Sequence, residues 1–397
     1  MDRGGGEKKY ILGLNRNVFY TGVVSMLMDV SSEMVYPLLP LFLTTVLGAT
    51  KTAVGIIEGI AETTASILKI FSGWLSDKLG KRKLLMGAGY GISAVSRPLI
   101  AIATAWSHVL GARFIDRVGK GTRTAPRDAI IADSTEREKL GLAFGFHRSM
   151  DTIGAIIGPG IAFLLLLVFV GNLRLVFFLS TIPAVISVLV IIFFITEKRR
   201  AREEAASLPR FSISDFDGPF RRYLVVVGVF SLGYFADAFV ILRAEDLGVK
   251  SALIPIIYLA FNIVYALSST PMGALADRIG LRRMVLAGFV YYSFIFVLIA
   301  FSTEALHIWI LFPLYGIYKG MSEGTLRAYL ATLAPPERKA TAFGVYHTVV
   351  GLMLLPASVV AGYLWDTVGP EATFLYGSGM SALAALIFVV FRPGKRQ

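Results

Sequence analysis

The sequence predicts an all-α membrane protein with twelve spans arranged as two similar six-helix bundles. Three observations lead to this prediction. First, 55% of the 397 residues are hydrophobic and 17% are charged, whereas soluble domains carry about 25% charged residues. Second, apolar runs of about 20 residues, the length that crosses a bilayer, recur along the whole chain. Third, one set of short motifs occurs twice, 199 or 200 residues apart.

The spans are predicted from the apolar runs. Those of the first half cover residues 17–46, 52–76, 83–104, 106–131, 141–169 and 173–196. Those of the second half cover residues 221–244, 251–275, 284–303, 306–332, 341–366 and 371–392. The charged stretch 197–220 lacks an apolar run and is predicted to be a cytoplasmic linker between the N-terminal bundle, 17–196, and the C-terminal bundle, 221–392. Residues 1–16 and 393–397 are predicted to be cytoplasmic tails.

Basic residues gather at every second connection between the spans. They cluster at 78–83, 137–139, 198–202, 221–222, 278–283, 338–339 and 392–396. Because Lys and Arg favour the cytoplasmic side, both termini are predicted to be cytoplasmic. This bias accounts for the net charge of +12, so no nucleic-acid partner is expected. The polar start of the chain has no signal-peptide pattern, and the first span is expected to direct its own insertion.

Residue usage adds two expectations. The chain has no cysteine, which excludes disulfides and thiolate chemistry. Asparagine occurs four times and glutamine once, and such scarcity of thermolabile residues favours a thermophilic source.

The internal repeat supports two halves of parallel topology. The segment Gly73–Arg82, GWLSDKLGKR, recurs as Gly273–Arg282, GALADRIGLR, and Lys120-Gly121 recurs as Lys319-Gly320. Both copies of the longer segment follow an even-numbered span, so the halves are related by an axis along the membrane normal.

The repeated loop GxLaDrxGrrk resembles the signature loop of the major facilitator superfamily, and the resemblance covers the whole chain. It implies a secondary transporter in which Asp77 contacts the N-terminus of the eleventh helix and Asp277 that of the fifth, which locks the halves together on the cytoplasmic side. A carboxylate suits such a helix N-terminus. The expected gate comprises Gly73, Asp77, Gly80, Lys81, Arg82, Gly273, Asp277, Gly280, Arg282 and Arg283, with Asp128 as acidic partner of the basic residues. The alternative is that these loops are only turns with cytoplasmic charge.

The fifth span contains Gly154, Gly158 and Pro159, in a GxxxGP pattern that resembles a motif frequent among drug–proton antiporters of this superfamily. Small residues four apart permit close helix packing, and proline opens the helical hydrogen-bond ladder and produces a bend. Packing alone explains the pattern equally well.

The fourth span carries a continuous charged stripe. At 100° per residue, its charged side chains fall within a sector of about 140°; they are Arg113, Asp116, Arg117, Lys120, Arg123, Arg127 and Asp128. Burying one charge at the bilayer centre costs at least about 2.5 kcal/mol, so the stripe must face water or counter-charges. Its spelling, DRxGKGxRxxPRDA, resembles that of a prokaryotic branch of the superfamily.

Counter-charges are available in other spans. The superfamily's fold places helices one, four, seven and ten around a central cavity. The candidates there are Asp29, Glu33, Glu58, Glu62, Asp237, Lys319, Glu323 and Arg327, with Lys69, Arg97, His147, Arg148, Asp151 and His347 as further ones. Alternatively, Glu58 and Glu62 lie near the external end, the histidines make interfacial hydrogen bonds, and buried ion pairs only fix the packing.

These features predict a proton-coupled transporter. Burial disfavours the charged form of a carboxylate, whereas a neighbouring Arg or Lys favours it, so a change in their separation would couple protonation to conformation. The expected proton site is Asp29 or Glu33, with Arg113 as its modulator and Asp237 as a further candidate. The expected substrate cavity includes Glu58, Glu62, Asp116, Arg117, Lys120, Arg123, Lys319, Glu323 and Arg327, where Lys120 and Lys319 serve as counter-charges.

The direction and the substrate remain open between two interpretations. Efflux by antiport is favoured, and proton-coupled or exchange transport of an organic or phosphate-bearing anion is the alternative. A non-transporting sensor is less expected because both tails are short. An enzyme is not expected because HExxH and GxSxG motifs are absent. The expected partners are a small-molecule substrate, protons and the lipid bilayer, for a monomer with neither cofactor nor metal.

Overall fold

The computed structural model describes residues 10–11, 13–136, 139–197, 216–335 and 338–392, and within these ranges it is almost entirely helical. The predicted basic connections around 137–138 and 336–337, the linker 198–215 and the last five residues lie outside the described residues. A short antiparallel hairpin, β1 (Tyr10–Ile11) and β2 (Leu14–Asn15), precedes the first helix.

Six spans form each half, as the sequence predicts. The first half consists of α1 (Arg16–Val35) continued by α2 (Leu39–Leu41) and the π-helical η1 (Phe42–Val46), then α3 (Lys51–Leu79), α4 (Arg82–Ala101), α5 (Trp106–Asp133), α6 (Leu140–Val168), and α7 (Leu173–Leu179) with α8 (Thr181–Phe194). The second half consists of α9 (Gly218–Gly233) with α10 (Ala238–Asp246), the 3₁₀ turn η4 (Ser251–Leu253) with α11 (Ile254–Ile279), α12 (Leu281–Ala300), α13 (Ala305–Leu333), α14 (Lys339–Thr367) and α15 (Pro370–Phe391).

Besides a short break at Ser180 between α7 and α8, two spans are interrupted where the sequence predicts continuous helices. The first breaks after Val35, where Pro37 and Pro40 follow closely and proline cannot donate to the helical ladder. The seventh breaks between Gly233 and Ala238. This second break leaves four residues of extended or turn backbone inside the bundle, and they line the cavity described below.

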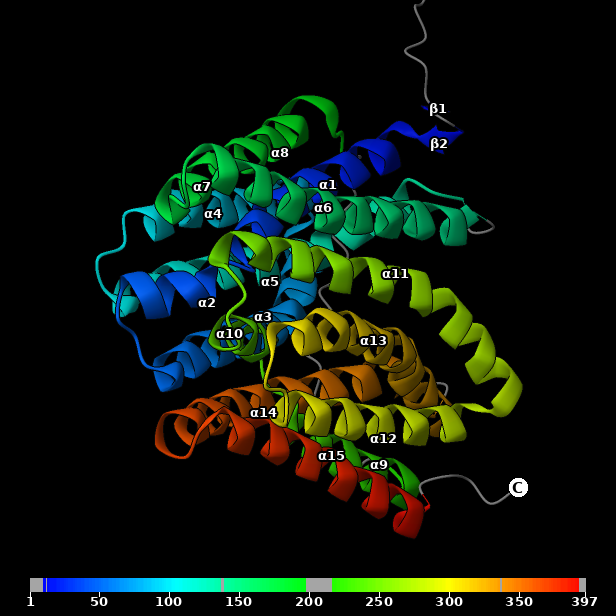
Figure 1. Ribbon diagram of the computed structural model, residues 1–397. Coiled ribbons are helices and arrows are strands. Elements are labelled where there is room, and N and C mark those ends of the chain that lie inside the picture. The colour runs from blue at the N-terminus through cyan, green and yellow to red at the C-terminus, as the bar shows by residue number, and fades with distance from the viewer. Residues whose placement is uncertain (1–9, 12, 137–138, 198–215, 336–337, 393–397) are drawn as a thin grey trace, which may run out of the picture.

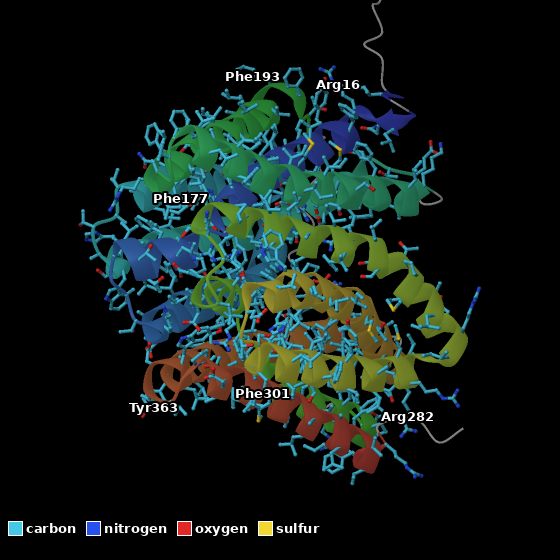
Figure 2. The ribbon with its side chains drawn as sticks, viewed as in Figure 1. Arg16, Phe177, Phe193, Arg282, Phe301 and Tyr363 are labelled. Carbon is cyan, nitrogen blue, oxygen red and sulfur yellow. The ribbon has the colours of Figure 1, made fainter. Side chains whose placement is uncertain are left out.

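Lipid-facing surfaces explain most of the composition. Among the described residues, nine spans are long and apolar enough to cross a membrane. The other three, α3, α5 and α13, carry most of the predicted cavity charges. Large apolar side chains point outward from the bundle, such as Phe193, Phe301 and Tyr363, which are 71%, 65% and 59% exposed (Figure 2). An apolar belt of this kind requires lipid as its solvent.

The halves lie one above the other in Figure 1, with α1 beginning and α15 ending on the same side of the bundle. We call this side the terminal side and the opposite side the far side. The halves meet along α3 and α14, along α6 and α11, and at the far ends through α2 and α10. The first two contacts pair the second span with the eleventh and the fifth with the eighth, which is what two halves of parallel topology produce.

Small residues bring α3 and α14 into close contact. A Cβ atom built on Gly59 would lie 2.8 Å from the Leu355 Cα atom, and one on Gly55 would overlap the Ser358 carbonyl at 2.1 Å. The Thr63 hydroxyl donates to the Gly351 carbonyl across the same contact, at 2.6 Å. Helix backbones therefore touch directly here, as is common where small residues line a membrane helix contact.

We predict that Gly59→Ala lowers the stability of the protein. The added methyl group meets the backbone of Leu355, which cannot move aside as a side chain would, and overpacking costs about 1–3 kcal/mol. The measurement is the thermal unfolding midpoint in detergent. The matched control is Gly91→Ala in α4, where a Cβ atom meets nothing within 4 Å; an equal fall in both variants would contradict the close contact.

Candidate functional site

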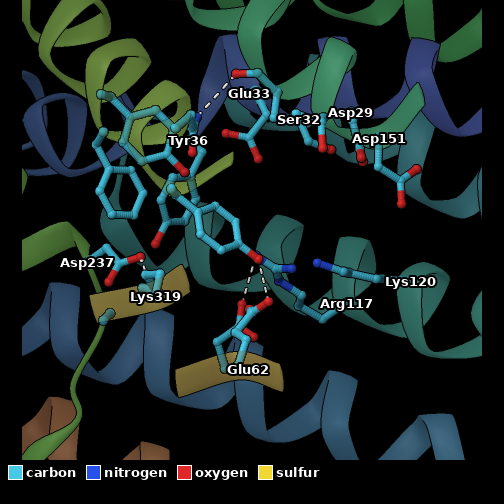
Figure 3. A pocket seen from close by; sticks show the side chains of 18 of the residues that line it. Asp29, Ser32, Glu33, Tyr36, Glu62, Arg117, Lys120, Asp151, Asp237 and Lys319 are labelled. Atoms are coloured by element: carbon cyan, nitrogen blue, oxygen red, sulfur yellow. Dashed lines mark hydrogen bonds and ion pairs between the residues drawn. The ribbon is translucent and has the colours of Figure 1, made fainter. Parts of the chain in front are cut away.

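A cavity of about 440 Å³ lies between the two halves. Spans one, four, seven and ten contribute to it, as the resemblance implies, but α3, α6 and α11 line it as well. Eleven of the thirteen residues predicted for proton coupling or substrate binding are at its wall: Asp29, Glu33, Glu62, Arg113, Asp116, Arg117, Lys120, Arg123, Asp237, Lys319 and Glu323 (Figure 3). Glu58 lies behind the wall, where it is 2% exposed, and Arg327 is half exposed outside it.

The cavity is accessible from the terminal side. Arg148 and Glu323 line it there and have side chains that are 61% and 48% exposed, whereas deeper residues such as Arg113 are 3% exposed. On the far side, α2 packs on α10, and the aromatic side chains of Phe42 and Phe239 are fully buried. The structure therefore has its cavity open towards the chain termini and closed at the opposite end.

The arginines of α5 are neutralised by acids from neighbouring helices. Arg113 donates to both oxygens of Glu58 at 2.6 and 2.8 Å. Arg117 forms an ion pair with Glu62 at 3.1 Å. Both acids belong to α3, one turn apart, and α3 packs along α5. Glu58 is thus an internal counter-charge, and the alternative that it is solvated at the external end is wrong.

Asp116 connects this network to α4. It accepts from Arg97 at 3.2 Å and lies 3.6 Å from the Arg113 guanidinium. Arg97 also donates to Ser31 and Ser32 of α1. A buried charge that kept no partner would be strongly destabilising. The charged stripe predicted from the sequence therefore exists. Arg113, Asp116 and Arg117 of this stripe form ion pairs with residues of other helices in the N-terminal half.

The predicted modulator role of Arg113 does not fit this geometry. Arg113 is paired with Glu58 and Asp116, not with Asp29 or Glu33. The reason is the arrangement of helices: α3 lies between α5 and the second half, whereas Asp29 and Glu33 lie on α1, which packs against α6. Helical periodicity placed the charges on a face but could not say which acid each one would meet.

Asp29 and Glu33 lie at the α1–α6 contact and face the cavity (Figure 3). Neither forms an ion pair with any residue that the structure describes, and one Glu33 oxygen is buried without a hydrogen bond. Cβ atoms built on Gly154 and Gly158 of α6 would lie 2.9 Å from the Asp29 Cβ and 2.7 Å from the Glu33 Cβ. The glycines of the GxxxGP motif thus pack directly on the two acids, and α6 continues through Pro159.

Asp151 completes a group of three carboxylates at this contact. It lies one turn before the glycine motif on α6 and lines the same cavity. One of its oxygens is 3.5 Å from His147 Nδ1, and the other is buried without a hydrogen bond. The second ring nitrogen of His147 contacts the Ser25 hydroxyl at 2.8 Å. The sequence analysis names Asp151 and His147 only as further candidates for the cavity, because the sequence does not show how deep in the bundle they lie.

The second half contributes a separate ion pair at the interrupted seventh span. Lys319 lies 3.0 Å from Asp237 and hydrogen-bonds Tyr234, and the Tyr315 hydroxyl donates to Asp237 at 2.9 Å. The sequence analysis predicts Lys319 as a counter-charge for substrate. In the structure this charge is already paired with Asp237 of its own half. Lys120 has no ion-pair partner among the described residues and points into the cavity (Figure 3).

An aromatic wall faces the charged half of the cavity. It consists of Tyr36, Tyr234, Phe235, Tyr258, Phe261 and Tyr265. The Tyr265 hydroxyl accepts from Arg148 at 2.6 Å and hydrogen-bonds Glu323, which links the two halves near the terminal side. Sequence reasoning missed this wall because aromatic residues are frequent throughout the membrane helices and carry no spacing signal.

The predicted gate residues lie at the terminal ends of the helices. Gly80 and Gly280 have positive φ values of 59° and 92° and end α3 and α11, as expected for turn glycines. Lys81, Arg282 and Arg283 are exposed there. Arg82 pairs with Asp133, and Asp128 pairs with Arg127 at 2.9 Å, so Asp128 is not the acidic partner that was predicted for the loop.

The gate predicted from the sequence contains two aspartates, Asp77 and Asp277. Asp277 is exposed, and no hydrogen bond joins it to the start of α6 within the described chain. The side chain of Asp77 and the burial of Gly73 lie outside what the structure describes, although the backbone of both belongs to α3. A built Cβ on Gly273 meets nothing within 4 Å. The interlocking of the halves on this side remains a prediction for a conformation in which the terminal side is closed.

Twelve spans around a cavity between two repeated halves define a class of polytopic membrane transporters. The model described as Major Facilitator Superfamily matches residues 21–242 and 223–397. The chain belongs to the major facilitator superfamily, whose members are transporters and not enzymes.

Known relatives agree with this assignment. The chain is 34% identical over 382 residues to an uncharacterized MFS-type transporter of Methanocaldococcus jannaschii, with 95% of each covered. It is 23% identical over 366 residues to a multi-drug resistance efflux pump PmrA homolog of Lactococcus lactis, covering 88% of this chain and 89% of that protein. The crystal structure of the nucleoside transporter NupG has the same fold, with a TM-score of 0.76 at 16% identity, covering 96% of this chain and 99% of NupG.

We predict that Glu58→Ala destabilises the protein by about 3–5 kcal/mol, because it leaves the buried Arg113 charge uncompensated. The double variant Glu58→Leu with Arg113→Leu removes both charges and should lose less stability than Glu58→Ala. Thermal unfolding midpoints in detergent compare the variants. A double variant less stable than the single one would show that the pair matters for more than charge compensation.

Proposed function

We propose that this protein is a proton-coupled antiporter that exports a small molecule by alternating access between its two halves. The proposed location is the cytoplasmic membrane of a prokaryote, with both termini in the cytoplasm. The alternation of basic connections supports this orientation, and the archaeal and bacterial relatives support the prokaryotic source. The terminal side would then be the cytoplasmic side, and the structure would represent an inward-open conformation.

The observation that carries the proposal is the pair of cavity-facing carboxylates without ion-pair partners. Most other acids at the cavity are neutralised by a basic residue within 4 Å. Asp29 and Glu33 are instead half-buried next to each other at the α1–α6 contact, and both line the cavity. Because burial disfavours their charged forms and water reaches them through the cavity, these groups are suited to bind and release protons.

Lys120 takes the modulating role that Arg113 does not fill. Lys120 and Arg123 line the same cavity as Asp29. Both are on α5, while Asp29 is on α1, and these helices touch less closely than α1 and α6 do. A change in the distance between α5 and α1 would alter the charge felt by the acids. Proton binding would thereby be coupled to the arrangement of helices around the cavity.

The cavity lining supports export of an amphipathic cation. Asp29, Glu33 and Asp151 line the cavity together with the aromatic wall, which the second half and Tyr36 of the first half form. Carboxylates attract a cation, and aromatic faces stabilise it by cation–π contact. A proton and a cation would then compete for the same acids, which is the basis of antiport. The relative described as a multi-drug resistance efflux pump homolog is in keeping with this direction.

A specific observation favours the second candidate, transport of an organic or phosphate-bearing anion. Lys120 lines the cavity without an ion pair, and Arg123 beside it contacts the Tyr90 ring at 4.4 Å without an acidic partner within the described residues. These two cations could receive a carboxylate or a phosphate. The two candidates therefore place substrate against opposite charges of the same cavity.

We predict that Asp29→Asn with Glu33→Gln abolishes coupling to protons. The purified protein is reconstituted into vesicles, a pH gradient is imposed, and movement of ethidium, an amphipathic cation, is followed by fluorescence. Gradient-driven movement should stop in the variant, because it lacks the two acids for which the proton and the cation compete. Asp246→Asn is the matched control, since Asp246 pairs with Arg243 outside the cavity. Movement in the unmodified protein that ignores the gradient would rule out proton coupling.

We predict opposite ligand responses for Lys120→Gln under the two candidates. Thermal-shift measurements with cationic and anionic metabolite sets separate them. If cations are exported, the variant keeps or strengthens stabilisation by cations, because a like charge is removed from the cavity. Loss of stabilisation by anions, with no cation response in the unmodified protein, would instead favour the second candidate.

A further inference from the structure

A carboxylate of the second half caps a helix of the first half on the far side. Asp366, at the end of α14, accepts from the backbone N–H groups of Lys51 at 3.0 Å and Thr52 at 2.8 Å. It also accepts from the Thr52 hydroxyl at 2.6 Å. These are the first two residues of α3. One side chain of the C-terminal bundle thus makes three hydrogen bonds to one turn of the N-terminal bundle.

The start of α3 depends on both halves for its hydrogen bonds. A helix leaves its first N–H groups without internal partners. The Thr50 side chain, from the same half, accepts from Ala53 at 3.1 Å, and Asp366 satisfies the two residues between them. A carboxylate at this position also interacts favourably with the positive end of the helix dipole. If the halves separated here, two backbone donors and one carboxylate would lose their partners together.

Close backbone contact positions this carboxylate. A Cβ atom on Gly362, one turn before Asp366, would lie 2.4 Å from the Lys51 carbonyl oxygen and 2.6 Å from the Thr52 Cα atom. The short Asp366 side chain reaches the N–H groups only because α14 lies directly on the start of α3. The three hydrogen bonds therefore belong to the conformation in which the far side is closed.

The residues around Asp366 form a third copy of the repeated loop pattern. Gly362–Gly369, GYLWDTVG, matches G-x-L-x-D-x-x-G in Gly73–Gly80 and Gly273–Gly280. The final glycine has a positive φ in all three copies, 59°, 92° and 133°. The third copy ends a helix that runs towards the far side and is followed by Pro370 and Glu371, not by basic residues. The absence of Lys and Arg there is typical of a connection outside the cytoplasm.

We propose that Asp366 is a far-side lock, which stabilises the conformation whose cavity opens on the terminal side. It has the chemistry that the resemblance implies for Asp77 and Asp277, a loop aspartate on the N-terminus of a helix in the other half, but at the opposite membrane face. Asp277 is exposed in the same structure. Locks at opposite ends of the bundle would stabilise opposite conformations. The proposal requires that the halves move, and it is independent of the substrate and of proton coupling.

The test is a distance measurement between spin labels without substrate or pH gradient. The chain has no cysteine, so labels attach only at introduced sites. Ser107→Cys with Leu306→Cys reports the far side, and Leu84→Cys with Arg221→Cys reports the terminal side; all four positions are exposed. Asp366→Asn should lengthen the far-side distances and shorten the terminal-side distances. The ratio of the two conformations should change by about tenfold, because charge-assisted hydrogen bonds are the stronger ones.

Two further variants make the result decisive. Glu371→Gln is the matched control, because Glu371 is a nearby acid that pairs with Arg243 inside its own half, and it should leave both distances unchanged. Thr52→Val removes only the hydroxyl donor and should shift the ratio in the same direction by a smaller factor; it decides the matter if Asp366→Asn does not fold. Unchanged distances in the folded variants, or an equal shift in Glu371→Gln, would overturn the proposal.

Discussion

The burial of the cationic stripe on α5 is the constraint on which the N-terminal half depends. Arginines in the middle of a membrane bundle are stable only with partners. Glu58 and Glu62 from α3 compensate Arg113 and Arg117, and Asp116 of the stripe itself pairs with Arg97 of α4. This requirement holds α3, α4 and α5 together, and it explains why these helices carry charges that their hydropathy would otherwise forbid.

Once these pairs have formed, few charges remain free to act. Asp29, Glu33 and Asp151 lie on the α1–α6 side of the cavity, and Lys120 and Arg123 face it from α5. The glycines of α6 are needed here because a larger side chain would push the acids away from their helix contact. The two sets of charges therefore lie apart: α3, α4 and α5 hold an ion-pair network, and α1 with α6 holds the cavity acids outside it.

The two halves are joined differently at their two ends. On the far side, backbone contacts through glycine and the Asp366 cap hold α3 on α14. Towards the terminal side, exposed polar side chains, Arg148 with Tyr265 and Glu323, provide the link. Side-chain links between exposed groups are weak because water competes for them. This asymmetry accounts for a cavity that is closed at one end and accessible at the other.

The sequence by itself determined the number of spans, the two parallel halves, the superfamily and eleven cavity residues, because hydropathy, repeats and helical periodicity are local properties of the chain. It could not decide which charges neutralise one another: Arg113 meets Glu58, Lys319 meets Asp237, and Arg82 meets Asp133. It also did not reveal the break in the seventh span, the aromatic wall or the role of Asp366. Those features depend on which helices pack side by side, and only the tertiary structure brings residues such as Thr52 and Asp366, more than 300 positions apart, into contact.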